Sequence, residues 1–335
     1  MMDLQKRIEE LTNLTGISSR EGTVLSYLQK TLEALGIASN VDITGNLRAR
    51  VSSYQADAKT ILLEAHMDRI GFMVSGIDGD GRLQFVPVGG VDERILSGLE
   101  VIVETDKTYF GIIVPANDEK KREYKDYRID IGLTEDDAKK QIPVGSAVSI
   151  RCETKRMFGD KLSGAGLDNR AGIAAILDCV SRIQKGKLPY HLELLFSQGE
   201  EIGLQGAYMA SVSADAAIVV DVTHGETFDT KGQTGVFPLG SGAVICRGPN
   251  LHYAYTNSLI NLAKEKKISY EIEVASASSG TNAWALQIQE NGIPCMLVSI
   301  PLRYMHTNLE MISLHDVQTT ADLLYFAVMG GIELA

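Results

Sequence analysis

The feature that most constrains this chain of 335 residues is an alternation of short apolar runs with helical segments, interrupted once by a long β-rich stretch. TILLEAH at 60–66 is an aliphatic run with the length of a buried strand. After about residue 160, predicted helices alternate with further runs of this kind, such as HLELLFS and AAIVVDVT. Strands that alternate with helices indicate a largely parallel or mixed sheet covered by helices, so we expect an α/β fold. The expected helices lie at about 2–14, 21–36, 169–185, 203–211, 251–267 and 282–291, with one more at the C-terminus.

The residues between about 70 and 160 have a different pattern. Short β-like runs such as RLQFVPVGG and YFGIIVP alternate with turns, and GLTEDDAKKQIPVG predicts one short helix. The charged run NDEKKREYKDYR at 117–128 predicts a solvated loop. We therefore expect an α/β domain made of 1–70 and 160–335, interrupted by a small β-rich domain at 71–159.

Composition excludes several classes of protein. The net charge of −11 argues against a nucleic-acid-binding protein, which would normally have a basic face. The chain has no long uncharged apolar run and its N-terminus lacks the pattern of a signal peptide, so we expect a cytoplasmic protein that does not enter a membrane. The four cysteines form no CxxC pair, which favours buried free thiols over a zinc–cysteine site or a disulfide framework.

Polar residues with metal-binding side chains lie at or just beyond the predicted strand ends and helix starts. In open α/β sheets, ligand sites form at such positions. Two histidines and three carboxylates are a natural ligand set for zinc, cobalt or manganese, and a carboxylate can bridge two ions. The residues in question are His66, Asp168, the pair Glu200 and Glu201, Asp221 and His306.

Asp168 lies at the start of an apolar helix, in the segment GAGLDNRAGIAAIL at 164–177. One interpretation is a helix N-cap, because an Asp side chain accepts a hydrogen bond from a free N–H at that end. The other is a ligand shared by two metals, because the small residues before it allow backbone and metal to approach closely.

The adjacent carboxylates Glu200 and Glu201 point in different directions on a turning backbone. One can bind metal while the other takes a proton from an attacking water. Asp68, two residues after His66, has the position of a carboxylate that orients the histidine ring. Taken alone, each residue also has an ordinary structural interpretation, such as a solvated loop for the glutamate pair. We assign His252 and His315 to caps or surface, and expect His224 near the site without binding metal.

Six blocks follow one another along the chain: HMDRIGFMV, LDNRAG, GEEIGLQGA, VVDVTH, SSGTNA and IPLRYMHTNLEM. Together they resemble the tetrahedral-aminopeptidase and glutamyl-aminopeptidase family of dinuclear metallopeptidases. The resemblance implies a phosphorylase/hydrolase-like α/β domain with an inserted β-barrel that serves dimerisation. It implies that Asp168 bridges two metals, with His66 and Asp221 completing one site and Glu201 and His306 the other. It also implies that Glu200 is the general base and that Asp68 supports His66.

The chain departs from the family pattern at three positions beside these blocks. Arg69 replaces a usually acidic residue, Gly199 a common glutamine and Asn282 a usual aspartate. None of them is an implied ligand. Arg69 can favour acidic substrates or pair with a carboxylate, and the sequence leaves both open.

The resemblance and the residues together predict an aminopeptidase that removes N-terminal residues from peptides. We expect two divalent ions per subunit, zinc or cobalt first and manganese as a further option, and a homo-oligomer between a dimer and a tetrahedral dodecamer. One alternative is a related amidohydrolase acting on small N-acyl compounds, and another is a non-catalytic member of the family. Glycoside hydrolysis is disfavoured because the paired carboxylates are adjacent and aromatic residues make up only 6% of the chain.

Overall fold

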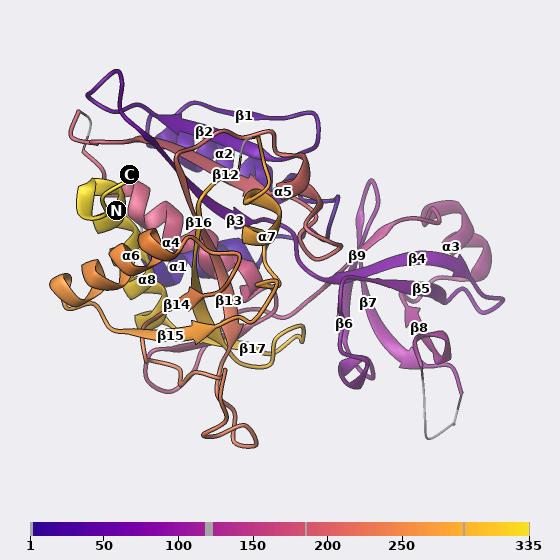
Figure 1. Cartoon of the computed structure of the whole chain (residues 1–335). Helices are drawn as coiled ribbons and strands as arrows, with labels where there is room; N and C mark the ends of the chain where they lie inside the picture. Colours follow the sequence, from indigo (N-terminus) through magenta and orange to yellow (C-terminus); the bar gives the residue numbers. More distant parts are fainter. Residues whose placement is uncertain (1–2, 118–122, 185, 291, 335) are drawn as a thin grey trace.

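The computed structural model describes residues 3–117, 123–184, 186–290 and 292–334, which form two parts (Figure 1). The larger part is an eight-stranded mixed sheet with helices on both faces, and the smaller part is a closed six-stranded barrel that projects from it. Both chain ends lie on the α/β part, away from the barrel. The predicted α/β fold with an inserted barrel is confirmed.

The order of strands in the large sheet is β1-β2-β12-β3-β13-β16-β14-β15. The central strands β12, β3, β13 and β16 run parallel, so their carboxyl ends meet at one edge of the sheet. Antiparallel pairing joins β2 to β12 and β14 to β16, while β15 runs parallel to β14. The strands are β1 Ser39–Val41, β2 Leu47–Val51, β3 Thr60–His66, β12 His191–Ser197, β13 Ala216–His224, β14 Ala243–Arg247, β15 Tyr270–Val274 and β16 Cys295–Leu302.

Each face of the sheet is covered by its own hydrophobic core. One core joins the sheet to the long helices α1, α4 and α8, and the other joins it to the short helices α5 and α7. Two predicted helices are shorter than expected, because the segment near 282–291 forms only four residues of helix and the segment near 203–211 only five. The helices are α1 Leu4–Thr12, α2 Gly22–Ala34, α4 Leu167–Ser181, α5 Gln205–Met209, α6 Tyr253–Lys266, α7 Ala283–Leu286 and α8 Leu314–Phe326, followed by η3 Ala327–Gly331.

The barrel has the strand order β4-β5-β8-β7-β6-β9 and encloses a separate core around Phe72 and Val148. Part of the charged run at 117–128 is not a loop, because Tyr127 and Arg128 begin strand β8. Tyr127 and Ile129 are buried there, and β8 closes the barrel by pairing with β5 and β7. Residues 118–122 lie outside the described residues. The barrel elements are β4 Gly71–Ile77, β5 Leu83–Val88, η1 Glu93–Ile95, β6 Glu100–Glu104, β7 Thr108–Pro115, η2 Tyr124–Asp126, β8 Tyr127–Asp130, α3 Glu135–Gln141 and β9 Ala147–Ile150.

The barrel is inserted between β3 and α4, so both of its connections to the α/β part run close to the carboxyl edge of the sheet. A small antiparallel sheet lies at the return connection and consists of β10 Lys155–Arg156, β11 Lys161–Gly164 and β17 Glu310–Ser313. The four cysteines are free thiols and three of them are buried. Within the described ranges, no helix is long and apolar enough to cross a membrane.

Candidate metal centre

Two groups of histidine and carboxylate side chains meet at the carboxyl edge of the parallel strands. His66 ends β3, Asp221 lies near the end of β13, and Asp168 lies in the first turn of α4. Glu201 follows β12, and His306 follows β16 in the connection to β17. The fold thus brings together the five residues that the sequence nominated as ligands, although they lie up to 240 positions apart along the chain.

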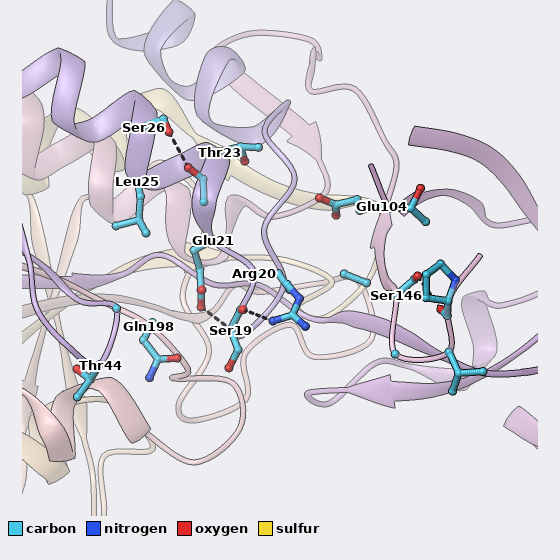
Figure 2. A pocket seen from close by; sticks show the side chains of 17 residues that line it. Ser19, Arg20, Glu21, Thr23, Leu25, Ser26, Thr44, Glu104, Ser146 and Gln198 are labelled. Atoms are coloured by element: carbon cyan, nitrogen blue, oxygen red, sulfur yellow. Dashed lines mark hydrogen bonds between the residues drawn. The ribbon is translucent and has the colours of Figure 1, made fainter. Parts of the chain in front are cut away.

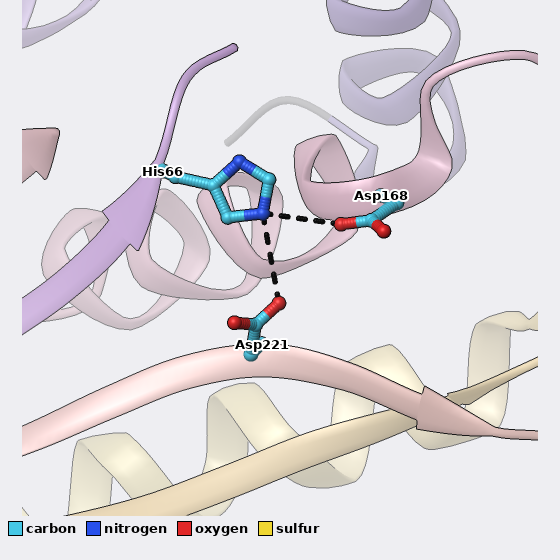
Figure 3. A group of neighbouring side chains, drawn as sticks. All are labelled: His66, Asp168 and Asp221. Atoms are coloured by element: carbon cyan, nitrogen blue, oxygen red, sulfur yellow. Dashed lines mark hydrogen bonds and ion pairs between the residues drawn. The ribbon is translucent and has the colours of Figure 1, made fainter. Parts of the chain in front are cut away.

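The first group consists of His66, Asp168 and Asp221 and is buried (Figure 3). Nε2 of His66 lies 3.1 Å from Oδ1 of Asp168 and 3.6 Å from Oδ1 of Asp221. Burial opposes protonation of His66, but the surrounding carboxylates outweigh it and raise the pKa of His66 well above its usual value. Burial also raises the pKa of Asp221. A divalent cation in this group would relieve the repulsion between the two buried carboxylates.

The second group consists of Asp168, Glu201 and His306. Nε2 of His306 lies 3.5 Å from Oδ2 of Asp168 and 3.3 Å from Oε2 of Glu201. Against the effect of burial, these two carboxylates raise the pKa of His306 to about 11. The other ring nitrogen, Nδ1, lies 3.1 Å from the carbonyl oxygen of Gly90, in the segment that follows barrel strand β5. The barrel therefore helps to orient one side chain of the site.

Asp168 belongs to both groups, because one of its oxygens faces His66 and the other faces His306. These two histidines hold the pKa of Asp168 below its usual value, although burial acts in the opposite direction.

Asp168 does not cap the helix, so that interpretation of the sequence is wrong. The cap is the next residue, since Oδ1 of Asn169 accepts the N–H of Gly172 at 3.1 Å. Asn169 also donates to the carbonyl of Val220 on β13, which leaves the carboxylate of Asp168 directed into the site.

Asp68 is fully buried beneath the histidine of the first group. Its backbone carbonyl lies 3.0 Å from Nδ1 of His66, and its Oδ1 lies 3.5 Å from the same nitrogen. Its carboxylate also accepts the N–H of Glu200 at 3.0 Å and the N–H of Glu201 at 3.2 Å. Ser18 donates to the same carboxylate at 2.7 Å. Asp68 thus fixes both the ring of His66 and the turn that holds the two glutamates.

Glu200 and Glu201 have different contacts, as expected for adjacent side chains that point in different directions on a turn. Glu201 joins the second group, and its Oε1 is buried without a hydrogen-bond partner among the described residues. Glu200 lines the cavity but belongs to neither group, and among the described residues it makes no ion pair within 4.0 Å. Burial and the charges of Asp221 and Glu201 raise the pKa of Glu200 to about 9.

Sequence reasoning missed Glu310, although it lies in a block that carried the resemblance. Oε2 of Glu310 accepts the N–H of Asp168 at 3.2 Å, and Oε1 accepts the N–H of His306 at 3.2 Å. His306 has a φ of +63°, an uncommon conformation for a residue with a side chain, and this contact helps to hold it. Burial and the charge of Asp168 raise the pKa of Glu310 to about 8. The sequence feature that could have identified Glu310 is its position four residues after the candidate ligand His306.

A second missed residue explains why Asn282 is present in place of an acid. Glu64 lies in the middle of β3 and is fully buried. Nδ2 of Asn282 donates to Oε1 of Glu64 at 2.8 Å and to Oγ of Ser197 at 2.9 Å, and Ser197 itself donates to Glu64 at 2.6 Å. An aspartate at 282 would place a second buried carboxylate beside Glu64, whereas the amide supplies a donor.

Arg69, the most unusual departure from the family pattern, does not point into the cavity. It is buried, and its guanidinium donates to the backbone carbonyls of Ile150 at 2.9 Å, Thr12 at 3.4 Å and Ala165 at 3.5 Å. These carbonyls lie where the barrel returns to the α/β part. Arg69 therefore fastens the two parts of the fold together, and it makes no contact that would select an acidic substrate.

The site opens into a cavity of about 570 Å³, large enough for an amino-acid residue and the start of a peptide. His224 lines this cavity without joining either ligand group, and His252 caps α6, as the sequence predicted. A larger cavity of about 1000 Å³ lies between the α/β part and the barrel, with Glu21 on one side and Glu104 and Ser146 on the other (Figure 2). It contains none of the ligand candidates, so its size does not make it the reaction site.

The fold and the site define a mixed α/β protein with an inserted barrel and a histidine–carboxylate cluster able to hold metal ions. The family model described as M42 glutamyl aminopeptidase matches residues 45–323. The chain belongs to this family and is a peptide-bond hydrolase of the aminopeptidase kind.

Three known proteins illustrate the similarity. A lysyl aminopeptidase from Pyrococcus furiosus is 29% identical over 96% of this chain and 94% of its own length. The PhTET1-12s dodecamer has a TM-score of 0.88 at 25% identity, covering 98% of this chain and 99% of that one. A protein named endoglucanase from Thermotoga maritima has a TM-score of 0.80 at 27% identity, covering 96% of each chain.

Proposed function

We propose that this protein is a dinuclear metal-dependent aminopeptidase that removes N-terminal residues from peptides. The observation that carries the proposal is the position of Asp168, whose two carboxylate oxygens face His66 and His306 separately. A carboxylate in that position can bridge two cations. Asp221 would complete the first site and Glu201 the second.

The chemistry of the donors fits two divalent cations. Oε1 of Glu201 is a buried oxygen without a partner in the described part of the chain, and a cation would satisfy it. The donor set of imidazole nitrogens and carboxylate oxygens suits zinc, cobalt or manganese. Three ligand carboxylates and Glu200 carry four negative charges when ionised, which equals the charge of two such ions. Bound there, the ions would polarise the scissile carbonyl and lower the pKa of the attacking water.

Side chains of this protein would transfer the proton and hold the ligands in position. Glu200 would accept a proton from the attacking water and then donate it to the leaving amine. It suits this task because it lines the cavity beside both ligand groups without belonging to either, which leaves its carboxylate free to take a proton. Asp68 would hold Glu200 in place through the backbone N–H, and Glu310 would hold Asp168 and His306.

Two other reactions are less well supported. A glycosidase needs two carboxyl groups on opposite sides of a bond, whereas Glu200 and Glu201 share one turn and Glu201 faces a histidine. The name of the Thermotoga maritima protein therefore does not favour a glycosidase here. An amidohydrolase acting on N-acyl compounds would use the same metals and base, so substrates must separate it from an aminopeptidase.

We also propose that the barrel at 71–159 is a dimerisation domain and that the protein forms a homo-oligomer. PhTET1-12s, which has the same fold, is a dodecamer. Phe110 and Ile112 project from one face of β7 and are 47% and 39% exposed, so the barrel offers apolar surface to a partner. Light scattering after size exclusion would distinguish a monomer, which contradicts this proposal, from a dimer or dodecamer.

The test of the reaction uses metal-stripped protein with zinc, cobalt or manganese added back. We expect it to release p-nitroaniline from aminoacyl p-nitroanilides with a free amine and not from their N-acetylated counterparts. Release of acetate from the acetylated compounds, with no p-nitroaniline released from the free-amine compounds, would instead indicate the amidohydrolase. The family is named for glutamyl substrates, whereas the Pyrococcus furiosus relative is named for lysyl substrates. These names therefore do not identify the N-terminal residue that this enzyme prefers.

A further inference from the structure

We propose that Glu273 binds the side chain of the substrate's N-terminal residue, so that the enzyme prefers peptides that begin with lysine or arginine. This inference rests on the aminopeptidase function proposed above and adds to it the chemical class of the substrate. It depends on the position of Glu273, on the charges around it and on the shape of the cavity wall.

Glu273 shares the cavity with the metal-ligand candidates. It lies on β15, where it pairs with Cys246 of β14, and its side chain lines the same cavity as those of His66 and Asp221. Its Oε1 accepts a hydrogen bond from Oγ1 of Thr223 at 2.8 Å. Thr223 comes two residues after Asp221 on β13, and two strand residues span about 6.5 Å. The carboxylate of Glu273 is thus held beside the strand that carries Asp221, two residues beyond that ligand candidate.

Glu273 forms no ion pair with another described residue. Four carboxylates at the metal centre would offset two divalent ions, and Glu273 is a fifth carboxylate in the same cavity. Among the described residues, no Lys, Arg or His nitrogen lies within 4.0 Å of it, although His224 lines the same cavity. Burial raises the pKa of Glu273, while the hydrogen bond from Thr223 and the charge of His224 act in the opposite direction. A cationic side chain of the substrate would supply the missing charge.

The rest of the wall suits a long side chain with an apolar stem. Leu204, Leu297 and Met305 contribute apolar surface, while Ser279 and Thr281 contribute hydroxyl groups. Lysine and arginine bury their methylene stems along apolar surface and keep the charged end in a polar environment. A substrate with an N-terminal glutamate would instead bring a sixth carboxylate into the cavity. The wall therefore favours basic residues over acidic ones.

The experiment compares kcat/KM for the p-nitroanilides of lysine, arginine, leucine and glutamate, using the metal-loaded protein and its Glu273→Gln variant. We expect the wild type to prefer lysine and arginine. Because a hydrogen bond to a charged group contributes about 1.5–3 kcal/mol, Glu273→Gln should lower the ratio of lysine to leucine hydrolysis by about 10- to 100-fold. The charge reversal Glu273→Lys should raise glutamate hydrolysis relative to lysine hydrolysis. Glu271→Gln, which changes an exposed carboxylate on the same strand, is the matched control and should leave the ratio unchanged.

Three outcomes would overturn the proposal. An equal loss with all four substrates in Glu273→Gln would mean that Glu273 binds the free α-amine that every substrate shares. An unchanged ratio in a variant that melts at the wild-type temperature would mean that Glu273 does not contact the substrate. Failure of the wild type to cleave any free-amine anilide with any metal would instead overturn the aminopeptidase function, and the specificity with it.

Discussion

The carboxylate of Asp68 accepts the backbone N–H of Glu200 at 3.0 Å, so a buried aspartate fixes the position of the proposed general base. The same carboxylate accepts the N–H of Glu201 and lies beside the ring of His66. One side chain therefore sets the relative positions of the base, a ligand of one metal and a ligand of the other. It does so from behind the site, without lining the cavity itself.

Replacing Asp68 by asparagine should impair both metal binding and turnover. The amide retains one acceptor oxygen, but its NH₂ group would face the N–H of Glu200 or Glu201. Loss of such an orienting partner typically costs 10- to 100-fold in metal affinity or activity. We expect kcat of Asp68→Asn to fall by about this factor in the presence of saturating metal. Asp57→Asn, in the exposed loop before β3, is the control, and equal activity of the two variants would refute a positioning role.

Glu310→Gln should weaken the second metal site. Glu310 uses one oxygen for the N–H of Asp168 and the other for the N–H of His306, and a glutamine can accept only one of the two. We expect the dissociation constant of the ion held by Asp168, Glu201 and His306 to rise by about 10- to 100-fold, measured by competition with a chelator. An unchanged constant would mean that Asp168 and His306 are held adequately by other contacts, such as that of His306 with Gly90.

The ligand candidates that the sequence predicted at the ends of apolar runs lie together in the structure, but the sequence did not identify the residue that caps α4. The strand-end positions of His66, Asp221 and His306 were readable because apolar runs stop just before or after them. The cap on α4 was misassigned because Asp168 and Asn169 are adjacent and both are good capping residues. Only the structure decides between them: the non-helical backbone continues through Asn169, with φ −113° and ψ 39°, and it is the Asn169 side chain that accepts the N–H of Gly172.

The free energy of unfolding should depend on pH through Glu64. Burial raises the pKa of Glu64 from 4.5 to about 7 in the folded protein. Between these two values the folded protein keeps the proton that the unfolded chain has lost, so the contribution of Glu64 to stability decreases as pH rises. Over this window the decrease is on the order of 3 kcal/mol. The variant Glu64→Gln cannot titrate, so it should lose less stability than the wild type between pH 4.5 and 7.5.

The measurement is urea unfolding of metal-free wild type and Glu64→Gln at several pH values. The difference between the two proteins isolates Glu64 from the other buried carboxylates, which titrate in both. Glu33→Gln, an exposed residue on α2, should follow the wild-type curve. Parallel curves for wild type and Glu64→Gln would show that Glu64 has an ordinary pKa in the folded protein.

Contacts between distant segments could not be predicted from the chain alone. Glu64 gave a signal, because a carboxylate inside the apolar run TILLEAH requires a buried partner, but nothing nearby in sequence identifies Asn282 as that partner. Arg69 gave a misleading signal, since its nearness to His66 suggested a role at the site. Its long side chain instead turns away to the carbonyls between the two parts of the fold. Gly199 adopts a φ of +63°, which a residue without a side chain tolerates best, so this departure suits the turn before Glu200.

The most direct test of the account is the Glu200→Gln variant, with metal content and turnover measured on the same preparation. We expect two divalent ions per chain in both wild type and variant, because Glu200 belongs to neither ligand group. Turnover of a free-amine anilide should fall by about 10²- to 10⁴-fold, the usual contribution of a general base, while Glu271→Gln remains active. A variant that keeps wild-type turnover, or a wild type that is fully active with its metals removed, would contradict the central claim.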